Sequence, residues 1–416
     1  MFHFTVAKNT IYQILAKATT SFVGFLITII IAREFGVVGY GDFTKITAFI
    51  ALFYLFVDFG LNAVYLQQEE GEDKNANKFF YLRIGFTFFI FAVSNIVAFF
   101  LPFNKALDLG FSPFIRLGIF IYSFSLFSQA VLTSASAFFQ KKLNYFPYFI
   151  SVFIGSLINL GVVFIFTYLG FSILYIVFSF VISGFITGLT SLYYIRDKIF
   201  PVSFDYALSK KLLVNAFPIG IMLVFNLIYF RADMFLLSLL KPARDVGIYG
   251  LSYKFFDFLL ALPLFLSNAL YPFLLANKNS PQKFFRIVKR YLVVFLFFSF
   301  AVVVPFWFLS PFLTLIKSDY FPAIVPFRIL LVSIPFFFLT SFLQWILISL
   351  KKQRFLAFIY AVSTVINIVL NLILIPQFSY IASAAITGIS EVFIFALLAF
   401  KVYSVKIFLL KKERNE

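Results

Sequence analysis

The chain has 416 residues, of which 62% are hydrophobic and 12% charged, a composition far outside the range of soluble domains. A soluble core cannot hide this much apolar surface, so part of that surface must face lipid. There is no cysteine and a single histidine, His3, which excludes disulfides, thiolate metal sites and histidine metal clusters. The formal charge of +17 is typical of basic loops beside a membrane and requires no nucleic-acid partner.

Apolar runs, separated by charged or Pro/Gly/Asn-containing breaks, predict about twelve transmembrane helices of roughly 20 residues. Each must be a helix, because every backbone amide in lipid needs an internal hydrogen-bond partner. The expected spans are 10–32, 46–66, 79–101, 114–138, 147–169, 172–194, 212–238, 248–274, 290–309, 323–349, 355–376 and 380–400. No small-residue cleavage site follows the first segment, so we expect a retained span. The predicted fold class is an all-α polytopic membrane protein.

Lysine and arginine residues orient the predicted spans. With both termini in the cytoplasm, about 23 of the 34 basic residues, Arg83 among them, fall on the cytoplasmic side and about 9 on the other. This bias predicts a multi-pass protein of the cell membrane with both ends inside. The acidic run 69–73 is expected to be a solvated loop, and the basic tail 401–416 is expected to lie at the inner lipid surface.

Recurring motifs indicate that one six-helix unit is used twice. Three pairs of motifs are about 209, 210 and 208 residues apart. They are Tyr40-Gly41/Lys45 with Tyr249-Gly250/Lys254, Lys141-Lys142 with Lys351-Lys352, and Ile158-Asn159 with Ile366-Asn367. The polar break 195–211 lies between the halves, so we predict an N-terminal bundle over 1–200, a C-terminal bundle over 201–400 and the tail. Six spans per half imply a pseudo-twofold axis along the membrane normal and a site in a cavity between the bundles.

Ionisable side chains inside predicted spans are candidates for function, because a charge in lipid is costly. From the helical rise, Lys17 and Asp58 both lie roughly 12 Å from the same membrane face. We expect them to face each other or a shared wet cavity. A structural ion pair that joins two helices is the alternative.

A second charged cluster is predicted near the outer end of the seventh and eighth spans, where Arg231 offers bidentate hydrogen bonds to a phosphate. Ion pairs at the outer rim are the alternative. The predicted substrate-binding residues of the basic cavity are Lys17, Arg231, Lys45 and Lys254. The candidates for ion coupling or ion pairing are Asp58, Asp233, Asp257 and Glu391.

Other polar or helix-breaking residues inside spans have less specific interpretations. Glu391, near the middle of the last span, is either protonated and inert or a site that couples a cation or proton. Asn159, Asn367 and Asn371 are expected to form hydrogen bonds between helices. The hinge candidates in the seventh span are Pro218 and Gly220, with a static kink as the alternative. With no Walker motif, ATP hydrolysis is not expected, and we predict no catalytic residue, metal or cofactor.

Short motifs spread over nearly the whole chain carry a resemblance to a known family. They are Lys8-Asn9, Ala32-Arg33-Glu34-Phe35-Gly36, Val38-Gly39-Tyr40-Gly41, Asp58-Phe59-Gly60-Leu61, Arg231-Ala232-Asp233, Val246-Gly247-Ile248-Tyr249-Gly250, and Asn367, Asn371 and Pro376 followed by Ala384-Ala385. In these motifs the chain resembles the polysaccharide-transport branch, the O-antigen-type flippases, of the multidrug/oligosaccharidyl-lipid/polysaccharide exporter superfamily.

The resemblance implies two six-helix bundles around a central cavity and transport by alternating access. The implied cargo is an undecaprenyl-diphosphate-linked oligosaccharide or a similar isoprenoid lipid, moved from the inner to the outer leaflet. A basic cavity with Lys17 and Arg231 would suit its diphosphate. Related peptidoglycan-precursor flippases carry fourteen spans and several arginines in the first two, whereas this chain has only Lys17 in the first span. That departure favours the repeat unit of a surface polysaccharide.

Three functions remain to be compared. A flippase for lipid-linked oligosaccharide is the main hypothesis, with membrane lipids, polysaccharide polymerase and assembly proteins as implied partners and a proton or sodium gradient as a candidate driving force. A cation-coupled multidrug or small-solute antiporter would prefer acidic residues in the cavity, and the predicted basic cavity counts against it. A membrane enzyme such as a polysaccharide polymerase needs larger outer loops than this chain has.

Overall fold

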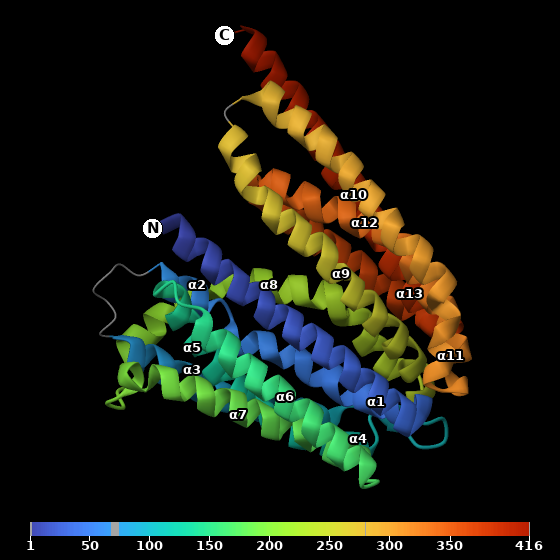
Figure 1. The fold of residues 1–416 in the computed structure, drawn as a ribbon. Coiled ribbons are helices and arrows are strands. Elements are labelled where there is room, and N and C mark those ends of the chain that lie inside the picture. The colour runs from blue at the N-terminus through green and yellow to red at the C-terminus, as the bar shows by residue number, and fades with distance from the viewer. Residues whose placement is uncertain (1, 68–74, 279, 416) are drawn as a thin grey trace. The chain divides into compact units, whose positions relative to one another are not determined.

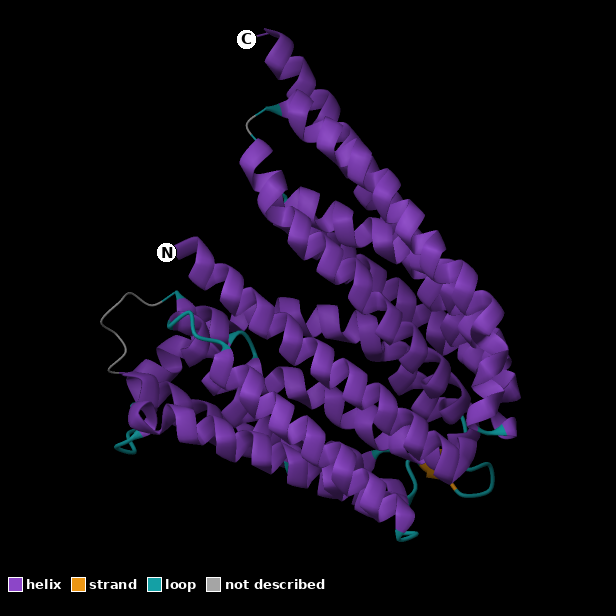
Figure 2. Ribbon diagram, viewed as in Figure 1, coloured by secondary structure: helices purple, strands orange, loops and turns teal. Residues whose placement is uncertain are grey.

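The computed structural model describes residues 2–67, 75–278 and 280–415, and this part of the chain is almost entirely helical (Figures 1 and 2). The helices are α1 (Phe2–Asp58), α2 (Leu61–Leu66), α3 (Ala76–Phe100), α4 (Pro113–Ser123), α5 (Ser125–Lys141), α6 (Phe146–Tyr168), α7 (Ile173–Ile199), α8 (Tyr206–Leu240), α9 (Ala243–Asn277), α10 (Pro281–Leu309), α11 (Leu313–Ile316), α12 (Ile324–Ser349) and α13 (Gln353–Asn415). Two short antiparallel strands, β1 (Phe103–Asn104) and β2 (Leu109–Gly110), join α3 to α4. The predicted loop at 69–73 lies outside the described residues.

In the described part, ten helices are long and apolar enough to cross a membrane, whereas the sequence predicted twelve. The difference comes from two spans of 59 residues each, Lys8–Leu66 and Gln353–Lys411. Within them, Gly36 and Ser379 have non-helical backbone with φ of 64° and 50°, so α1 and α13 each consist of two helices joined across a kink. Composition located the apolar segments, but it does not report whether the helix continues between them.

The turns after α5 and α12 have the same backbone hydrogen bonds. In the turn after α5, N–H groups donate from Lys142 to Phe138, from Leu143 to Gln140 and from Asn144 to Phe139. In the turn after α12, they donate from Leu350 to Ile346, from Lys351 to Ile348 and from Lys352 to Leu347. The turn after α6 has this pattern too, with Gly170 at a positive φ of 72°, so these bonds are a recurrent way of ending a helix. The internal repeat and its spacing therefore stay a prediction from the sequence motifs.

The chain divides into two compact units. The first comprises Met1–Arg231 and Lys241–Gly247, and the second comprises Ala232–Leu240 and Ile248–Glu416. In the first unit α1 packs on α6, and α7 packs on α5 and α6; in the second, α12 packs on α10 and α13 (Figure 1). The boundary falls inside α8, directly after Arg231.

Two glycines allow the segment Lys241–Gly247 to pack into the first unit. A Cβ atom on Gly41 would lie 1.8 Å from the carbonyl oxygen of Ala243, and one on Gly247 would lie 2.0 Å from the carbonyl oxygen of Val37. No side chain fits at either position without moving backbone. Gly41 of the first repeat motif and Gly247, which lies just before the second motif, therefore cross backbone against backbone, which explains why these two positions need glycine.

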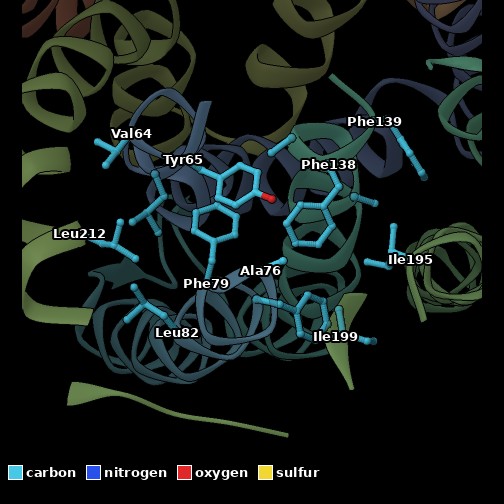
Figure 3. Packing of buried hydrophobic residues seen from close by; sticks show 14 of the residues in the cluster. Val64, Tyr65, Ala76, Phe79, Leu82, Phe138, Phe139, Ile195, Ile199 and Leu212 are labelled. Carbon is cyan, nitrogen blue, oxygen red and sulfur yellow. The ribbon is translucent and has the colours of Figure 1, made fainter. Parts of the chain in front are cut away.

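One end of the first unit is closed by an aromatic cluster. The ring of Tyr65 lies 4.5 Å from that of Phe79 and 5.2 Å from that of Phe138, measured between centroids (Figure 3). A cation lies over each ring: Arg83 over Phe79 at 4.7 Å, Lys141 over Tyr65 at 5.0 Å and Lys198 over Phe138 at 5.2 Å. Cation–π attraction of this kind stabilises charge where water is excluded. The cluster thereby fixes Arg83 inside the unit.

Candidate functional site

An ion pair between the half-buried Asp58 and the buried Arg83 lies at the break between α1 and α2. Phe59 and Gly60 have φ of 41° and 79°, which ends α1 after Asp58 and starts α2. The Asp58 carboxylate oxygen Oδ1 accepts from the backbone N–H of Asn62 at 3.2 Å and from Arg83 Nη2 at 3.1 Å. Asp58 therefore caps the short helix that follows it and compensates a buried guanidinium.

Arg83 is the centre of this network. Its side chain is 0% exposed, and it also donates to Asn62 Oδ1 at 2.7 Å and to Ser134 Oγ at 3.0 Å. The sequence counted Arg83 with the charges of the cytoplasmic side, at the start of the predicted span 79–101, and the structure places it inside α3, which begins at Ala76. The sequence also proposed Lys17 as the partner of Asp58, whereas the ion pair that the structure contains is with Arg83.

Lys17 lies on α1 with an exposed side chain, next to exposed apolar residues. One turn further along the same face is Thr20, whose hydroxyl donates to the Lys17 carbonyl at 2.9 Å. By the helical rise of about 1.5 Å per residue, Lys17 is roughly 13 Å from Lys8, the first residue of the span. An exposed ammonium at such a depth is favourable only where water reaches it.

Lys45, a predicted substrate-binding residue, is 1% exposed. Its ammonium donates to the carbonyl oxygens of Gly110 at 2.8 Å and of Lys241 at 3.1 Å. These bonds join the β1–β2 loop and the segment Lys241–Gly247 to α1. Lys45 thus has a structural role in the first unit, and the site proposed below does not include it.

A polar cavity of about 270 Å³ lies inside the first unit, and we call it the N-unit cavity. It is lined by residues of α1, α4, α5, α6 and α7, and Thr20 is one of the lining residues on α1. Its hydrogen-bonding side chains are all neutral and include Ser125, Ser128, Gln129, Ser156, Asn159 and Thr187. Tyr54 hydrogen bonds to Ser125 at 2.7 Å across it. Among the residues that the structure describes, no Lys, Arg, Asp or Glu lines this cavity.

Two acidic residues are enclosed in the second unit by hydroxyl groups. Asp233 is 3% exposed and accepts from the Tyr249 hydroxyl and, at 3.2 Å, from that of Thr387. Glu391 is 2% exposed and accepts from the Thr340 hydroxyl. These two of the four candidates for ion coupling or ion pairing lie on α8 and α13, and each accepts a hydrogen bond from a hydroxyl group of another helix.

Asn159 and Asn367 bond between helical segments, as expected, whereas the bonds that Asn371 donates lie within one helical segment. Asn159 accepts from Ser179 at 3.3 Å, joining α6 to α7. Asn367 donates to Ser390 at 3.0 Å, joining the two parts of α13 across its kink, and Asn371 donates to Asn367 at 2.9 Å.

The structure gives the positions of the remaining predicted site residues, and their functional roles stay predictions. Arg231 is half-buried at the last position of the first unit's main segment, and Lys254 and Asp257 are half-buried on α9 in the second unit. The hinge candidates Pro218 and Gly220 lie inside α8. A Cβ atom on Gly220 would lie 2.7 Å from the ring of Phe59, so close packing alone explains why this position is glycine. The hinge remains a prediction.

Sequence reasoning missed Arg83 and the N-unit cavity. A signal for the cavity existed: Ser125, Ser128 and Gln129 follow the spacing of one helix face inside a predicted span. Within the described ranges, no group of three His, Cys, Asp or Glu residues is placed to hold a metal ion.

Comparisons of the fold find several transporters. The structure named "Lipid II flippase MurJ, inward closed conformation" matches with a TM-score of 0.75 at 18% identity, over 95% of this chain and 87% of that one. An inward-facing multidrug resistance MATE family transporter of the MOP superfamily matches with a TM-score of 0.75 at 12% identity, over 93% and 95%. A MOP superfamily transporter from Pyrococcus furiosus matches with a TM-score of 0.61 at 14% identity, over 97% and 96%. At these identities the likeness shows the fold alone.

Sequence-family models give the more specific result. A search of curated proteins found no match. The MatE family model matches residues 218–373. The model described as "Polysaccharide biosynthesis protein" matches residues 6–278, which is more than half of the chain. The protein is a multi-pass membrane protein whose fold is similar to that of these transporters, and it belongs to the polysaccharide biosynthesis protein family.

Proposed function

We propose that this protein is a flippase that moves an isoprenoid-diphosphate-linked oligosaccharide, the repeat unit of a surface polysaccharide, from the inner to the outer leaflet. Membership of a polysaccharide biosynthesis family supports this function, and so does a fold shared with a lipid II flippase. A sugar headgroup has no path through hydrocarbon, whereas a transporter with wet polar side chains provides one while the lipid tail stays in the membrane.

The observation that carries the proposal is the exposed ammonium of Lys17 on α1. A lysine at this depth suits a diphosphate, because an ionic hydrogen bond to phosphate is among the stronger polar interactions. Arg231 is the second candidate for phosphate binding, since its guanidinium can bond two oxygens at once.

The transport cycle that we propose is alternating access between two repeated bundles, with twelve crossings and both termini in the cytoplasm. The kinks at Gly36 and Ser379 supply the two further crossings, because each divides a span of 59 residues. The excess of basic residues on one side supports the orientation. Pro218 and Gly220 are the proposed hinge in α8.

A proton or sodium gradient is the proposed driving force, with Asp233 and Glu391 as the coupling residues. Both carboxyl groups are buried in the second unit beside hydroxyl donors. A hydroxyl can turn from donor to acceptor, so it can stay bonded when the carboxyl group takes up a proton. If ionophores that collapse either gradient leave the flipping rate unchanged in vesicles, this part of the proposal is wrong.

The test is translocation of a fluorescent undecaprenyl-diphosphate-linked oligosaccharide in liposomes. Wild type should move the lipid, and Lys17→Ala should slow it by roughly tenfold, because a lost charged hydrogen bond to phosphate costs about 1.5 kcal/mol or more. Lys17→Arg should keep most of the rate. Lys105→Ala, which removes an exposed lysine between β1 and β2, is the matched control and should have no effect.

The second candidate is a cation-coupled multidrug or small-solute antiporter. The MatE model over residues 218–373 favours it, and so do the two buried acids of the second unit. Wild-type vesicles that export cationic dyes but fail to move several isoprenoid-diphosphate glycans would select this function over the flippase.

A further inference from the structure

The N-unit cavity is built for a neutral ligand. A metal cation would need carboxylate ligands and a phosphate would need lysine or arginine, and none of these lines the cavity in the described part of the chain. Its polar lining consists of hydroxyl and carboxamide groups, which both donate and accept. The chemical class that this lining fits is a neutral molecule that carries several hydroxyl or amide groups.

Two side chains have hydrogen-bonding capacity left for such a ligand. Asn159 is 8% exposed, and its Oδ1 accepts from Ser179. Among the described residues nothing accepts from the Asn159 Nδ2 group. Gln129 uses its Nε2 to donate to Thr133 Oγ1 at 3.2 Å, which leaves its Oε1 as an acceptor. Asn159 is buried and Gln129 is half-buried, and both line the cavity, so these two atoms are available to a ligand or to water inside it.

The volume and the aromatic lining of the cavity further limit which neutral molecules fit. Its volume of about 270 Å³ is just below the range of roughly 300 to 1,000 Å³ that is usual for small-molecule sites. One sugar ring fits that volume, whereas an oligosaccharide does not. The aromatic rings of Tyr54, Tyr122 and Phe180 line the same space, with centroids 6.1 Å apart in each neighbouring pair. Aromatic faces are suited to the apolar C–H face of a sugar ring.

The position of the cavity relates it to the proposed phosphate contact. Thr20, which lines the cavity, is exposed and lies one helical turn from Lys17 on the same face of α1. We propose that the N-unit cavity binds one neutral sugar ring of the cargo, the one next to the diphosphate, while Lys17 binds the diphosphate. The assignment of the ring to a lipid-linked cargo rests on the proposed flippase function.

Direct binding is measured first, because it does not depend on transport. Phe180→Trp, in a background with Trp307→Phe and Trp345→Phe, places the only indole of the chain at the cavity. Titration with the methyl glycosides of glucose and N-acetylglucosamine should change its fluorescence saturably. Adding Asn159→Leu should weaken binding by roughly threefold to tenfold, the usual value of one neutral hydrogen bond. Asn95→Leu, which removes an amide bonded to Ser123 outside the cavity, should not.

Two results of the titration overturn the assignment. One is a folded Phe180→Trp protein that responds to neither glycoside, which leaves a cavity that holds only water. The other is an equal response to inorganic phosphate, which makes the cavity an anion site.

Transport measurements distinguish a failure of the sugar-binding proposal from a failure of the proposed flippase function. In liposomes, undecaprenyl diphosphate with and without its glycan is compared for wild type, Asn159→Leu, Gln129→Leu and Asn95→Leu. The two cavity variants should lose rate for the glycosylated lipid by roughly threefold to tenfold and keep the rate for the bare lipid. If they keep the wild-type ratio, the cavity does not hold the cargo's sugar. If wild type moves neither lipid, the flippase function fails, while the titration still decides whether the cavity binds sugar.

Discussion

The two units differ in what fills their interiors at positions that the predicted repeat would pair. At a spacing of 208 residues, one of the three that the sequence motifs indicate, Gln129 would correspond to Phe337 and Val152 to Tyr360. Gln129 and Val152 line the polar N-unit cavity, whereas Phe337 is buried, with its ring 5.3 Å from that of Phe256. If the repeat holds, an aromatic side chain fills in the second unit a position that lines a cavity in the first.

The units also differ in the groups that bond to their acidic side chains. In the first unit the half-buried Asp58 is paired with the Arg83 guanidinium, whereas in the second the buried Asp233 and Glu391 accept hydrogen bonds from hydroxyl groups. The Arg83 contact is charge-assisted, so we expect its loss to cost more stability than the loss of a neutral hydroxyl donor.

The largest loss of stability is expected where the backbone at Gly41 crosses the backbone at Gly247. Gly41→Ala should reduce the free energy of unfolding by at least about 3 kcal/mol, because the new Cβ would lie 1.8 Å from the carbonyl oxygen of Ala243, which belongs to backbone and cannot rotate away. The measurement is thermal unfolding in detergent. Gly85→Ala is the control, since no atom lies within 4 Å of its Cβ position. Equal melting of the two variants would contradict the close crossing.

The next largest losses of stability are expected from removing the partner of Asp58 in the first unit and from neutralising Asp233 in the second. Arg83→Met should cost about 3 kcal/mol, because it leaves the Asp58 carboxylate without its ion-pair partner, whereas Asp233→Asn should cost about 1 kcal/mol, the value of a weakened hydrogen bond. The double variant Asp58→Asn with Arg83→Met should recover part of the loss. If Asp233→Asn is as costly as Arg83→Met, the contrast between the acids of the two units is wrong.

A smaller change in stability is expected when Gln129, which lines the cavity, and Phe337, in the second unit, are each replaced by the other's residue type. Phe337→Gln should cost about 2 kcal/mol, because it buries an amide and removes an aromatic ring. Gln129→Phe should change the unfolding free energy by less than about 1 kcal/mol, because the ring enters existing space. Both are measured by unfolding in detergent. A large loss in Gln129→Phe would mean that the cavity cannot take a ring at all.

Sequence reasoning found the class and the family, because these depend on patterns along the chain. Apolar runs report lipid contact directly. The recurrence of Tyr-Gly-x-x-x-Lys at Tyr40 and Tyr249 predicts a duplication, which stays a prediction.

The partners of individual charges could not be found in the same way. Arg83 lies inside both the predicted span 79–101 and α3, but it was counted with the cytoplasmic charges because it is near the start of the helix. Asp58 is inside a span, as predicted, whereas Lys45 was expected just before the second span and lies inside α1. Their partners are Arg83 and backbone carbonyls, from segments distant in sequence. Pattern along one chain shows which charges are buried, but three-dimensional packing decides which groups compensate them.

The smallest predicted effect concerns an exposed contact of the first unit and its dependence on pH. The backbone N–H of Leu208, at the start of α8, donates to Asp205, and this bond together with the Lys78 ammonium at 3.1 Å lowers the pKa of the Asp205 carboxyl below its usual value. A lowered pKa means that the contribution to stability is present above the ordinary pKa of an aspartate and is lost as the pH falls through the lower, folded-state value.

Asp205→Asn keeps an acceptor for the helix cap but removes the charge. We therefore expect wild type to melt slightly above this variant near pH 6, and the difference to vanish as the pH falls to about 3 or lower. Melting curves of both proteins across this range, at low and high salt, measure it. Lys78→Gln should reproduce the neutral-pH loss, because it removes the other member of the pair. A difference that persists unchanged at low pH would show that the carboxylate charge contributes nothing and that Asp205 acts only as a cap.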